Sequence, residues 1–155
     1  MLQVFKWSIN MKKQILSLLA VVLFASNSHA ACRYSNTVET PTTHLANNNA
    51  RTGLVWLSNT SKHPITLNIK VYDDSGSDVT SSVVSGGGSM SLNPKGSGYF
   101  TLLGNGVART TFGELTWTSQ ECLRKPMIGT VETLYQAGSS RYGSMANPIN
   151  SGRPF

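Results

Sequence analysis

The chain is poor in the residues that most often carry out catalysis. It has three histidines among 155 residues, and charged residues make up only 13% of the sequence. A nucleophilic hydrolase needs a serine or cysteine beside a base that a third group orients. Neither a G-x-S-x-G motif nor an S-x-x-K motif, two patterns that mark such nucleophiles, occurs in the sequence. We therefore predict that the protein is not an enzyme and has no catalytic residues.

Clustered positive charge and metal ligands are also scarce. Apart from Arg124 and Lys125, the basic residues after position 30 stand singly along the chain, which argues against nucleic-acid binding. His44 and His63 lie nineteen positions apart, unlike the close ligand spacing typical of a zinc site. The acidic turn 73–78 lacks the glycine and glutamate spacing of an EF-hand. We predict no metal and no cofactor; four carboxylates that could pair across a sheet keep a glycosidase-like site open, namely Glu39, Glu114, Glu121 and Glu132.

The longest apolar run is too short to span a membrane. Residues 15–25 are apolar apart from one serine, about half of the roughly 20 residues that a transmembrane helix needs. Two lysines precede the run, and small residues close it at Ser28 and Ala30, which is the pattern of a secretory signal peptide. We predict that residues 1–30 form a signal helix, with Met11 as an alternative start, and that cleavage falls between Ala30 and Ala31. The mature chain is then secreted or periplasmic and has no transmembrane segment.

The sequence has only two cysteines, and both follow the predicted signal peptide. In an oxidising compartment, Cys32 and Cys122 are expected to form one disulfide. Such a bridge closes a loop of about 90 residues. In the chain-entropy model it would stabilise the folded protein by roughly 4 to 5 kcal/mol, because it restricts the unfolded chain. A free thiol pair and a lipid anchor on Cys32 are the alternatives. Lipidation is the poorer match, because His29 stands three positions before Cys32, where an aliphatic residue is expected.

Residues 54–72 contain the clearest strand pattern. From Ile65 to Val71, aliphatic residues alternate with polar ones, which predicts a strand with one buried face. The apolar run Leu54–Leu57 precedes it, and the turn-forming residues 58–64 separate the two, so we predict a hairpin. Shorter strand patterns follow at residues 79–84, 99–103, 112–118 and 127–135.

No segment after the signal peptide has helical periodicity. Short strands about ten residues apart, separated by Gly, Asn and Pro turns, predict an all-β fold, a single antiparallel β-sandwich of about six to eight strands. We place this domain at residues 51–135, after a lead-in loop at 31–50. Residues 136–155, rich in Gly, Ser, Asn and Pro, are predicted to form an extended tail, either packed against the sheet or free for self-association with a second copy.

Three local features resemble bacterial secreted immunoglobulin-like modules. They are the strand pair of Val55–Ser61 and Ile65–Tyr72, the Asp-x-x-Gly turn at Asp73–Gly76, and the Leu-x-Pro step at Leu92–Pro94. The resemblance implies an immunoglobulin-like sandwich. The two cysteines depart from antibody domains, because their spacing is far too wide for a bridge around a central tryptophan. A likeness of fold carries no activity with it.

The expected function follows from export, the β-pattern and the missing catalytic motifs. We expect a non-enzymatic structural or binding module of the cell envelope or exterior, which contacts a protein or glycan partner. Trp56 and Trp117 are predicted to pack in the core, with a carbohydrate-stacking platform as the alternative. A secreted hydrolase, or an inhibitor of one, with a site assembled from distant loops is the competing hypothesis. A hollow holding a histidine or two close carboxylates would favour it.

Overall fold

The computed structural model describes residues 31–46, 50–105, 108–137 and 140–155. The predicted signal peptide and its last residue, Ala30, lie outside the described residues. Cys32–Phe155 form one compact unit. Within the described part of the chain, no helix is long and apolar enough to cross a membrane.

The compact unit consists almost entirely of β-strands, which confirms the predicted all-β class. One short helix, α2 (Thr80–Val83), and one 3-10 turn, η2 (Ile149–Gly152), interrupt the strands. The strands are β1 (Arg33–Glu39), β2 (Thr43–Leu45), β3 (Arg51–Asn59), β4 (Ile65–Asp73), β5 (Val84–Ser85), β6 (Ser89–Leu92), β7 (Ser97–Leu102), β8 (Arg109–Leu123), β9 (Met127–Ala137) and β10 (Ser140–Pro148).

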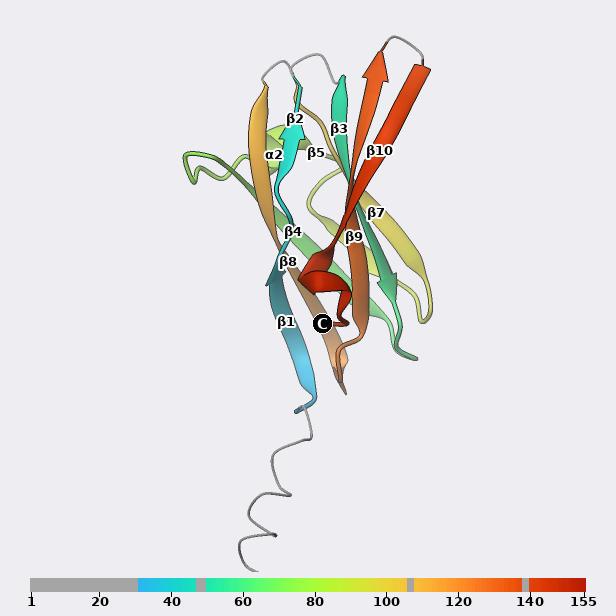
Figure 1. Ribbon diagram of the computed structural model, residues 1–155. Helices are drawn as coiled ribbons and strands as arrows, with labels where there is room; N and C mark the ends of the chain where they lie inside the picture. The colour runs from blue at the N-terminus through green and yellow to red at the C-terminus, as the bar shows by residue number, and fades with distance from the viewer. Residues whose placement is uncertain (1–30, 47–49, 106–107, 138–139) are drawn as a thin grey trace, which may run out of the picture. The chain divides into compact units, whose positions relative to one another are not determined.

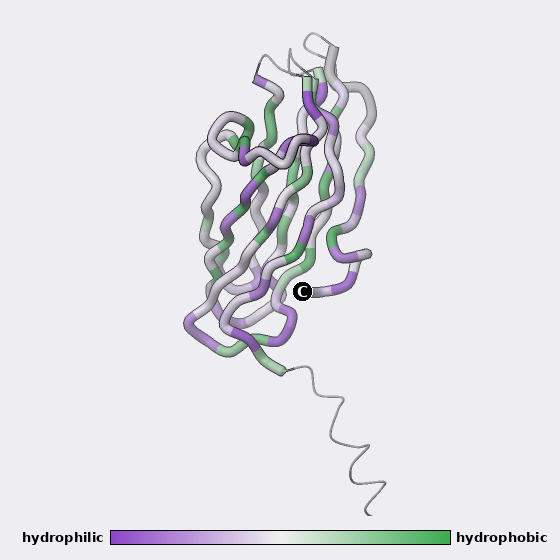
Figure 2. The backbone as a smooth tube through the Cα atoms, turned by 90° about the vertical axis from the view of Figure 1, so that its left-hand side faces the viewer, coloured by the Kyte–Doolittle hydropathy of each residue, from purple (hydrophilic) through white to green (hydrophobic). Residues whose placement is uncertain are grey.

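Two antiparallel sheets make up the sandwich (Figure 1). Sheet A has the order β1-β8-β4-β6, and β2 also pairs with β8. Sheet B has the order β10-β9-β3-β7-β5. Apolar residues alternate with polar ones along the strands (Figure 2), as expected where one face of each sheet is buried. The predicted antiparallel sandwich is thus confirmed.

The core is built from the alternate positions of the central strands. Every second side chain from Ile65 to Val71 on β4 is buried, as the sequence predicted. Sheet B contributes Val55 and Leu57 of β3, and β8 contributes Leu115 and Trp117. Each of these residues is at most 2% exposed. Burial of this apolar surface, at roughly 25 cal/mol per Å², is the main force that holds the sheets together.

Strands β3 and β4 do not form the predicted hairpin. Strand β3 pairs with β7 and β9 in sheet B, whereas β4 pairs with β6 and β8 in sheet A. Each strand has its own apolar face, and these faces meet across the core instead of lying side by side in one sheet. The buried side chain of Asn59 stabilises the loop that leads from β3 in sheet B to β4 in sheet A. Its amide N–H donates to the His63 carbonyl at 2.8 Å and to the Asn93 carbonyl at 3.0 Å, and its amide oxygen accepts from Ser61 N–H at 2.9 Å.

The two segments outside the predicted sandwich boundaries also belong to the sheets. The predicted lead-in loop contains β1 and β2, which pair with β8. The predicted tail contains β10, which pairs with β9, and its last residue, Phe155, is buried. Phe155 also exchanges main-chain hydrogen bonds of 2.9 and 3.0 Å with Met127. Both segments are polar because edge strands bury little surface and are held mainly by their main-chain pairing. The C-terminal segment is therefore packed against its own sheet.

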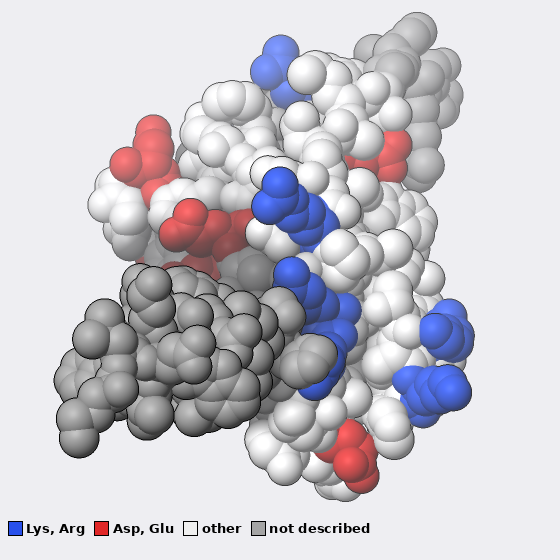
Figure 3. All heavy atoms as spheres, turned by 60° about the horizontal axis from the view of Figure 1, so that its bottom comes forward, with Lys and Arg blue, Asp and Glu red and all other residues white. Residues whose placement is uncertain are grey.

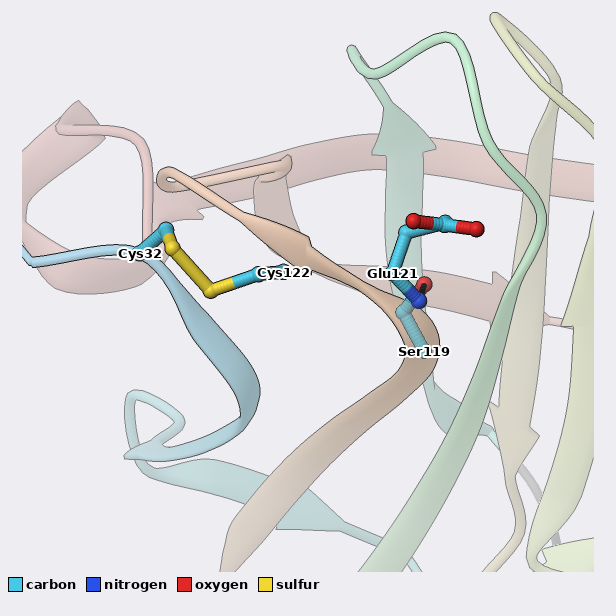
Figure 4. The surroundings of a disulfide bond; sticks show 4 residues. All are labelled: Cys32, Ser119, Glu121 and Cys122. Atoms are coloured by element: carbon cyan, nitrogen blue, oxygen red, sulfur yellow. Dashed lines mark hydrogen bonds between the residues drawn. A yellow bond between two sulfur atoms is a disulfide. The ribbon is translucent and has the colours of Figure 1, made fainter.

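The expected disulfide is present. Cys32 and Cys122 are bonded, with 5.2 Å between their Cα atoms and 90 positions between them in sequence. Figure 4 shows the bridge between the start of β1 and the end of β8. It fastens the first strand to the longest strand of sheet A, at the edge where β1 has a neighbour on one side only.

Candidate binding surface

The two histidines singled out from the sequence lie in separate places. His44, on β2, places Nδ1 2.7 Å from the Thr110 hydroxyl of the adjacent β8. His63 lies in the loop between β3 and β4, as expected for a turn residue. No group of His, Cys, Asp and Glu side chains in the described residues could hold a metal ion.

A hollow of about 530 Å³ lies beside His63. Residues 118–121 at the end of β8 and Ser91 of β6 also line it, so a histidine, a serine and a carboxylate share one site. The Ser119 hydroxyl donates to the Pro64 carbonyl at 3.3 Å and accepts from Glu121 N–H at 3.1 Å. Figure 4 shows Ser119 and Glu121 on the β8 backbone near the disulfide. In the part of the chain that the structure describes, the Ser119 hydroxyl forms hydrogen bonds with main-chain groups and not with the His63 ring.

The two tryptophans of the sandwich have opposite environments. Trp117 is 1% exposed and lies in the core, as predicted. Trp56 is 36% exposed, so its predicted place in the core is wrong. Val55 and Leu57 point inward, and neighbouring side chains of a strand point to opposite faces, so Trp56 must point outward. The continuous apolar run that begins at Leu54 concealed this parity.

Trp56 forms an aromatic pair with Tyr99 on the outer face of sheet B. The two residues are direct neighbours on β3 and β7, with ring centroids 4.6 Å apart and ring planes tilted by 49°. Tyr99 is 51% exposed. Glu132, from β9 on the other side of β3, accepts a hydrogen bond of 2.9 Å from Trp56 Nε1. This bond and the cross-strand contact fix the orientation of an exposed tryptophan ring.

A hollow of about 350 Å³ adjoins the aromatic pair. Leucine and threonine side chains complete its walls, and none of the described residues that line it is charged. These wall residues are Thr52, Leu54, Thr101, Leu103 and Leu134. We call Trp56, Tyr99, Glu132 and these wall residues the aromatic face. The sequence did not single out Tyr99 and Glu132 for this role. The alternation around Phe100 and Leu102, both buried, could have placed Tyr99 on the outside.

The outer face of sheet A carries a second aromatic pair. Tyr72 and Phe112 are direct neighbours on β4 and β8, stacked with centroids 5.5 Å apart. The Tyr72 hydroxyl donates to Glu114 at 3.2 Å. Burial raises the pKa of Tyr72, and the hydrogen bond and negative charge of Glu114 and the charge of Asp78 raise it further. Lys70 lies directly opposite Glu114, so this face is charged around its aromatic pair.

Comparisons with known proteins give no family. No family model matches the chain, and neither does any curated protein. Among solved structures, the chain is similar to one described as "Crystal Structure of Thermotoga maritima 1070", with 12% sequence identity and a TM-score of 0.49. The match covers 81% of this chain and 100% of that chain. A likeness of this size carries no argument about function, which has to rest on the surfaces described above.

Proposed function

We propose that this protein is an exported, non-enzymatic binding module of the cell envelope or exterior, and that its aromatic face binds a glycan. The observation that carries the proposal is the exposed Trp56–Tyr99 pair beside a neutral hollow, with Glu132 hydrogen-bonded to the tryptophan. Exposed aromatic side chains that are held in place at a concave surface are typical of ligand sites.

A sugar ring suits the chemistry of this face. The C–H bonds of a pyranose ring form an apolar surface that can pack on the Trp56 and Tyr99 rings, while its hydroxyls need hydrogen-bond partners. The threonine hydroxyls of the hollow can donate and accept hydrogen bonds, and a carboxylate such as Glu132 has several acceptor positions. The apolar rings and the nearby polar groups would thus both be used. A protein partner is the alternative occupant of the face.

Export is part of the same proposal. The Cys32–Cys122 disulfide supports it, because disulfides persist mainly in oxidising compartments such as the periplasm or the exterior. Bacterial lipidation attaches to a cysteine sulfur, and the sulfur of Cys32 is already bonded to Cys122. The proposal therefore predicts a mature chain that begins at Ala31 without a lipid. Intact-mass measurement of the protein recovered from expressing bacteria tests this, and a lipid mass on Cys32 would contradict it.

The strand order supports an immunoglobulin-like centre for the module. In an immunoglobulin domain one sheet has the order A-B-E-D and the other holds C, F and G. Here β3, β7 and β5 follow the order B-E-D, and β4 lies beside β8 as C lies beside F. The flanking strands are exchanged: β9 lies beside β3, and β1 lies beside β8.

The hollow at His63 keeps a hydrolase as the second candidate. It brings together His63, Ser119 and Glu121, which is the one observation in its favour. Against it stands the Ser119 hydroxyl, which is engaged with the main chain. If the protein is not a hydrolase, His63→Ala in a protein that still folds should leave unchanged any phenotype that depends on the protein. Loss of the phenotype would favour the hydrolase.

Glycan binding by matched aromatic variants tests the main proposal. Affinity electrophoresis against a panel of envelope and extracellular polysaccharides would first identify a ligand. Trp56→Ala and Tyr99→Ala should then each weaken its binding by about tenfold or more, as central aromatic residues of interfaces do. Phe112→Ala removes an exposed aromatic ring from the other sheet and should leave binding unchanged. Equal losses in all three variants, or no glycan bound by the wild type, would reject the proposal.

A further inference from the structure

Positive charge is concentrated at one end of the sandwich. At the end where β3 and β8 stop and β4 and β9 begin, there are six exposed basic residues and one acidic residue, Glu121. The six are Arg33, Lys62, Lys95, Arg124, Lys125 and Arg153. We call them the basic end; its net charge, with Glu121, is +5. The rest of the compact unit has four basic and six acidic residues, a net charge of −2.

Hydrogen bonds between loops place these residues together. The Lys95 ammonium donates to the Thr60 carbonyl, which joins the β6–β7 loop to the β3–β4 loop that holds Lys62. Thr60 N–H donates to the Pro126 carbonyl at 2.7 Å, which brings in the loop of Arg124 and Lys125. These three loops therefore lie side by side.

The two ends of the compact unit reach the same place. Arg33 is opposite Leu123, next to the Arg124 loop, and the pairing of Phe155 with Met127 brings Arg153 there. Figure 3, which turns this end toward the viewer, shows Lys and Arg side chains spread across it. Along the sequence these residues stand almost singly, so only the fold gathers them.

We propose that the basic end docks on an anionic phospholipid surface. Its charges stand on loops and at the two ends of the compact unit, which suits contact with an extended charged surface, whereas duplex nucleic acid is usually read by a stripe or an inserted helix. Tyr34, 62% exposed and adjacent to Arg33, adds an aromatic ring of the kind that is enriched at membrane interfaces. Cys32, the first residue of the compact unit, also lies at this end.

The uneven distribution of charge between the basic end and the rest of the compact unit orients the docked protein. At physiological ionic strength, charges more than about 8 Å from a surface are largely screened, so the basic end dominates the attraction. The negative remainder of the unit is repelled when it approaches the same surface. Each Lys or Arg near an anionic membrane strengthens binding by roughly fivefold. The attraction therefore depends on where the charges are and not on net charge alone.

Two double variants with the same change in net charge test this docking. Lys62→Gln/Arg124→Gln removes two charges from the basic end, and Arg51→Gln/Lys70→Gln removes two from elsewhere. Binding of the purified, oxidised protein to vesicles of phosphatidylcholine with phosphatidylglycerol is measured by co-sedimentation, at low and at high salt. Circular dichroism and thermal unfolding check that each variant is folded.

The wild type should bind the mixed vesicles at low salt and dissociate from them at high salt. It should not bind vesicles of phosphatidylcholine alone. The basic-end variant should lose about 25-fold in affinity and the control variant about twofold or less. Equal losses in the two variants, binding to neutral vesicles, or no binding to the mixed vesicles would overturn the proposal. Tighter binding to duplex DNA than to the vesicles at the same salt would also overturn it. These readouts are independent of glycan binding by the aromatic face.

Discussion

The outer faces of the two sheets carry similar groups in different surroundings. Each face has an aromatic pair from neighbouring strands, and in each pair one ring donates a hydrogen bond to a glutamate. On sheet B the bond joins Trp56 to Glu132, and on sheet A it joins Tyr72 to Glu114. The neighbours of the two pairs differ. The sheet B pair borders a hollow walled by leucine and threonine, whereas the sheet A pair has Lys70 and Asp78 nearby.

The two aromatic pairs differ in what surrounds their rings, and the proposed binding surface depends on that difference. Sheet A stacks its rings among charged residues: Glu114 accepts the Tyr72 hydrogen bond, Lys70 lies opposite Glu114, and the charge of Asp78 acts on Tyr72. Sheet B leaves its tilted rings more exposed and places a neutral hollow beside them. A neutral ligand with an apolar surface gains contact area only at the second arrangement. The proposed ligand site is therefore placed at the sheet B pair because of the surroundings of its rings.

The largest expected difference between the sheets concerns the disulfide, which holds only sheet A. Cys32→Ser/Cys122→Ser should lower the free energy of unfolding by about 4 kcal/mol, because the unfolded chain is no longer constrained. Denaturant unfolding measures this loss. Hydrogen exchange should quicken more in β1 than in β9, since β1 is the strand fastened by the bridge. Equal changes in the two strands would show that the bridge supports both sheets alike.

The next difference separates the inside of the sandwich from its outside. Trp117→Ala should cost about 3 to 5 kcal/mol of unfolding free energy, as for other buried aromatic residues. Trp56→Ala should cost about 1 to 2 kcal/mol, from lost cross-strand contact and the bond to Glu132. Thermal and denaturant unfolding compare the two variants.

Trp117→Phe is the control for the comparison of Trp117→Ala with Trp56→Ala. The indole Nε1 of Trp117 has no hydrogen-bond partner among the described residues, so phenylalanine removes a buried unpaired donor together with some volume. This variant should be clearly more stable than Trp117→Ala. Equal costs for Trp56→Ala and Trp117→Ala would contradict the assignment of Trp56 to the surface.

The two glutamates give a smaller and sharper contrast. Glu132→Ala should weaken glycan binding by about fivefold, because Trp56 loses the bond that orients its ring and the ligand loses an acceptor. Glu114→Ala, the matched change on sheet A, should leave glycan affinity unchanged. Calorimetric titration with the identified glycan provides the measurement. A loss of affinity in Glu114→Ala would place the ligand on sheet A and contradict the proposed site on sheet B.

The smallest effect concerns the ionisation of Tyr72. Burial and the contact with Glu114 raise its pKa, so Glu114→Gln should lower that pKa while burial keeps it above the usual value of about 10. A raised folded-state pKa means that the contribution to stability is complete below pH of about 10 and is lost as pH rises through the folded pKa. Ultraviolet difference absorbance follows the titration. An unchanged Tyr72 pKa in Glu114→Gln would leave burial and the charge of Asp78 as the causes of the raised pKa.

Side-chain alternation made the fold class predictable, and its loss in one run caused the main error. The pattern from Ile65 to Val71 gave the correct buried face. In the run from Leu54 to Leu57 every residue is apolar, so the sequence could not tell which side Trp56 occupies. Strands β1 and β10 lack an apolar pattern because main-chain pairing holds them at sheet edges. Alternation therefore identifies strands with a buried face and misses those held by their neighbours.

Features that depend on long-range contacts could not be predicted. The six residues of the basic end are nearly isolated from each other in sequence and meet only because three loops and both ends of the unit converge. The partner of Trp56 is likewise forty-three positions away in sequence, on β7. Pairing between distant strands is decided by the fit of whole faces across the core and not by any local motif. The disulfide was predictable because two cysteines allow only one pairing.

The buried side chain of Asn59 limits the hosts in which this protein can be produced. Asn59-Thr60-Ser61 matches the acceptor pattern for N-linked glycosylation, yet Asn59 is 1% exposed and its amide bonds to the loops around it. In a eukaryotic secretory pathway, a sugar attached to this amide before folding would block those bonds and the corner between the sheets. Secretion from yeast or mammalian cells should therefore yield misfolded glycoprotein, and Asn59→Asp would not repair it, because the amide donor is lost. Bacterial export, which forms the disulfide without modifying the asparagine, is the suitable route.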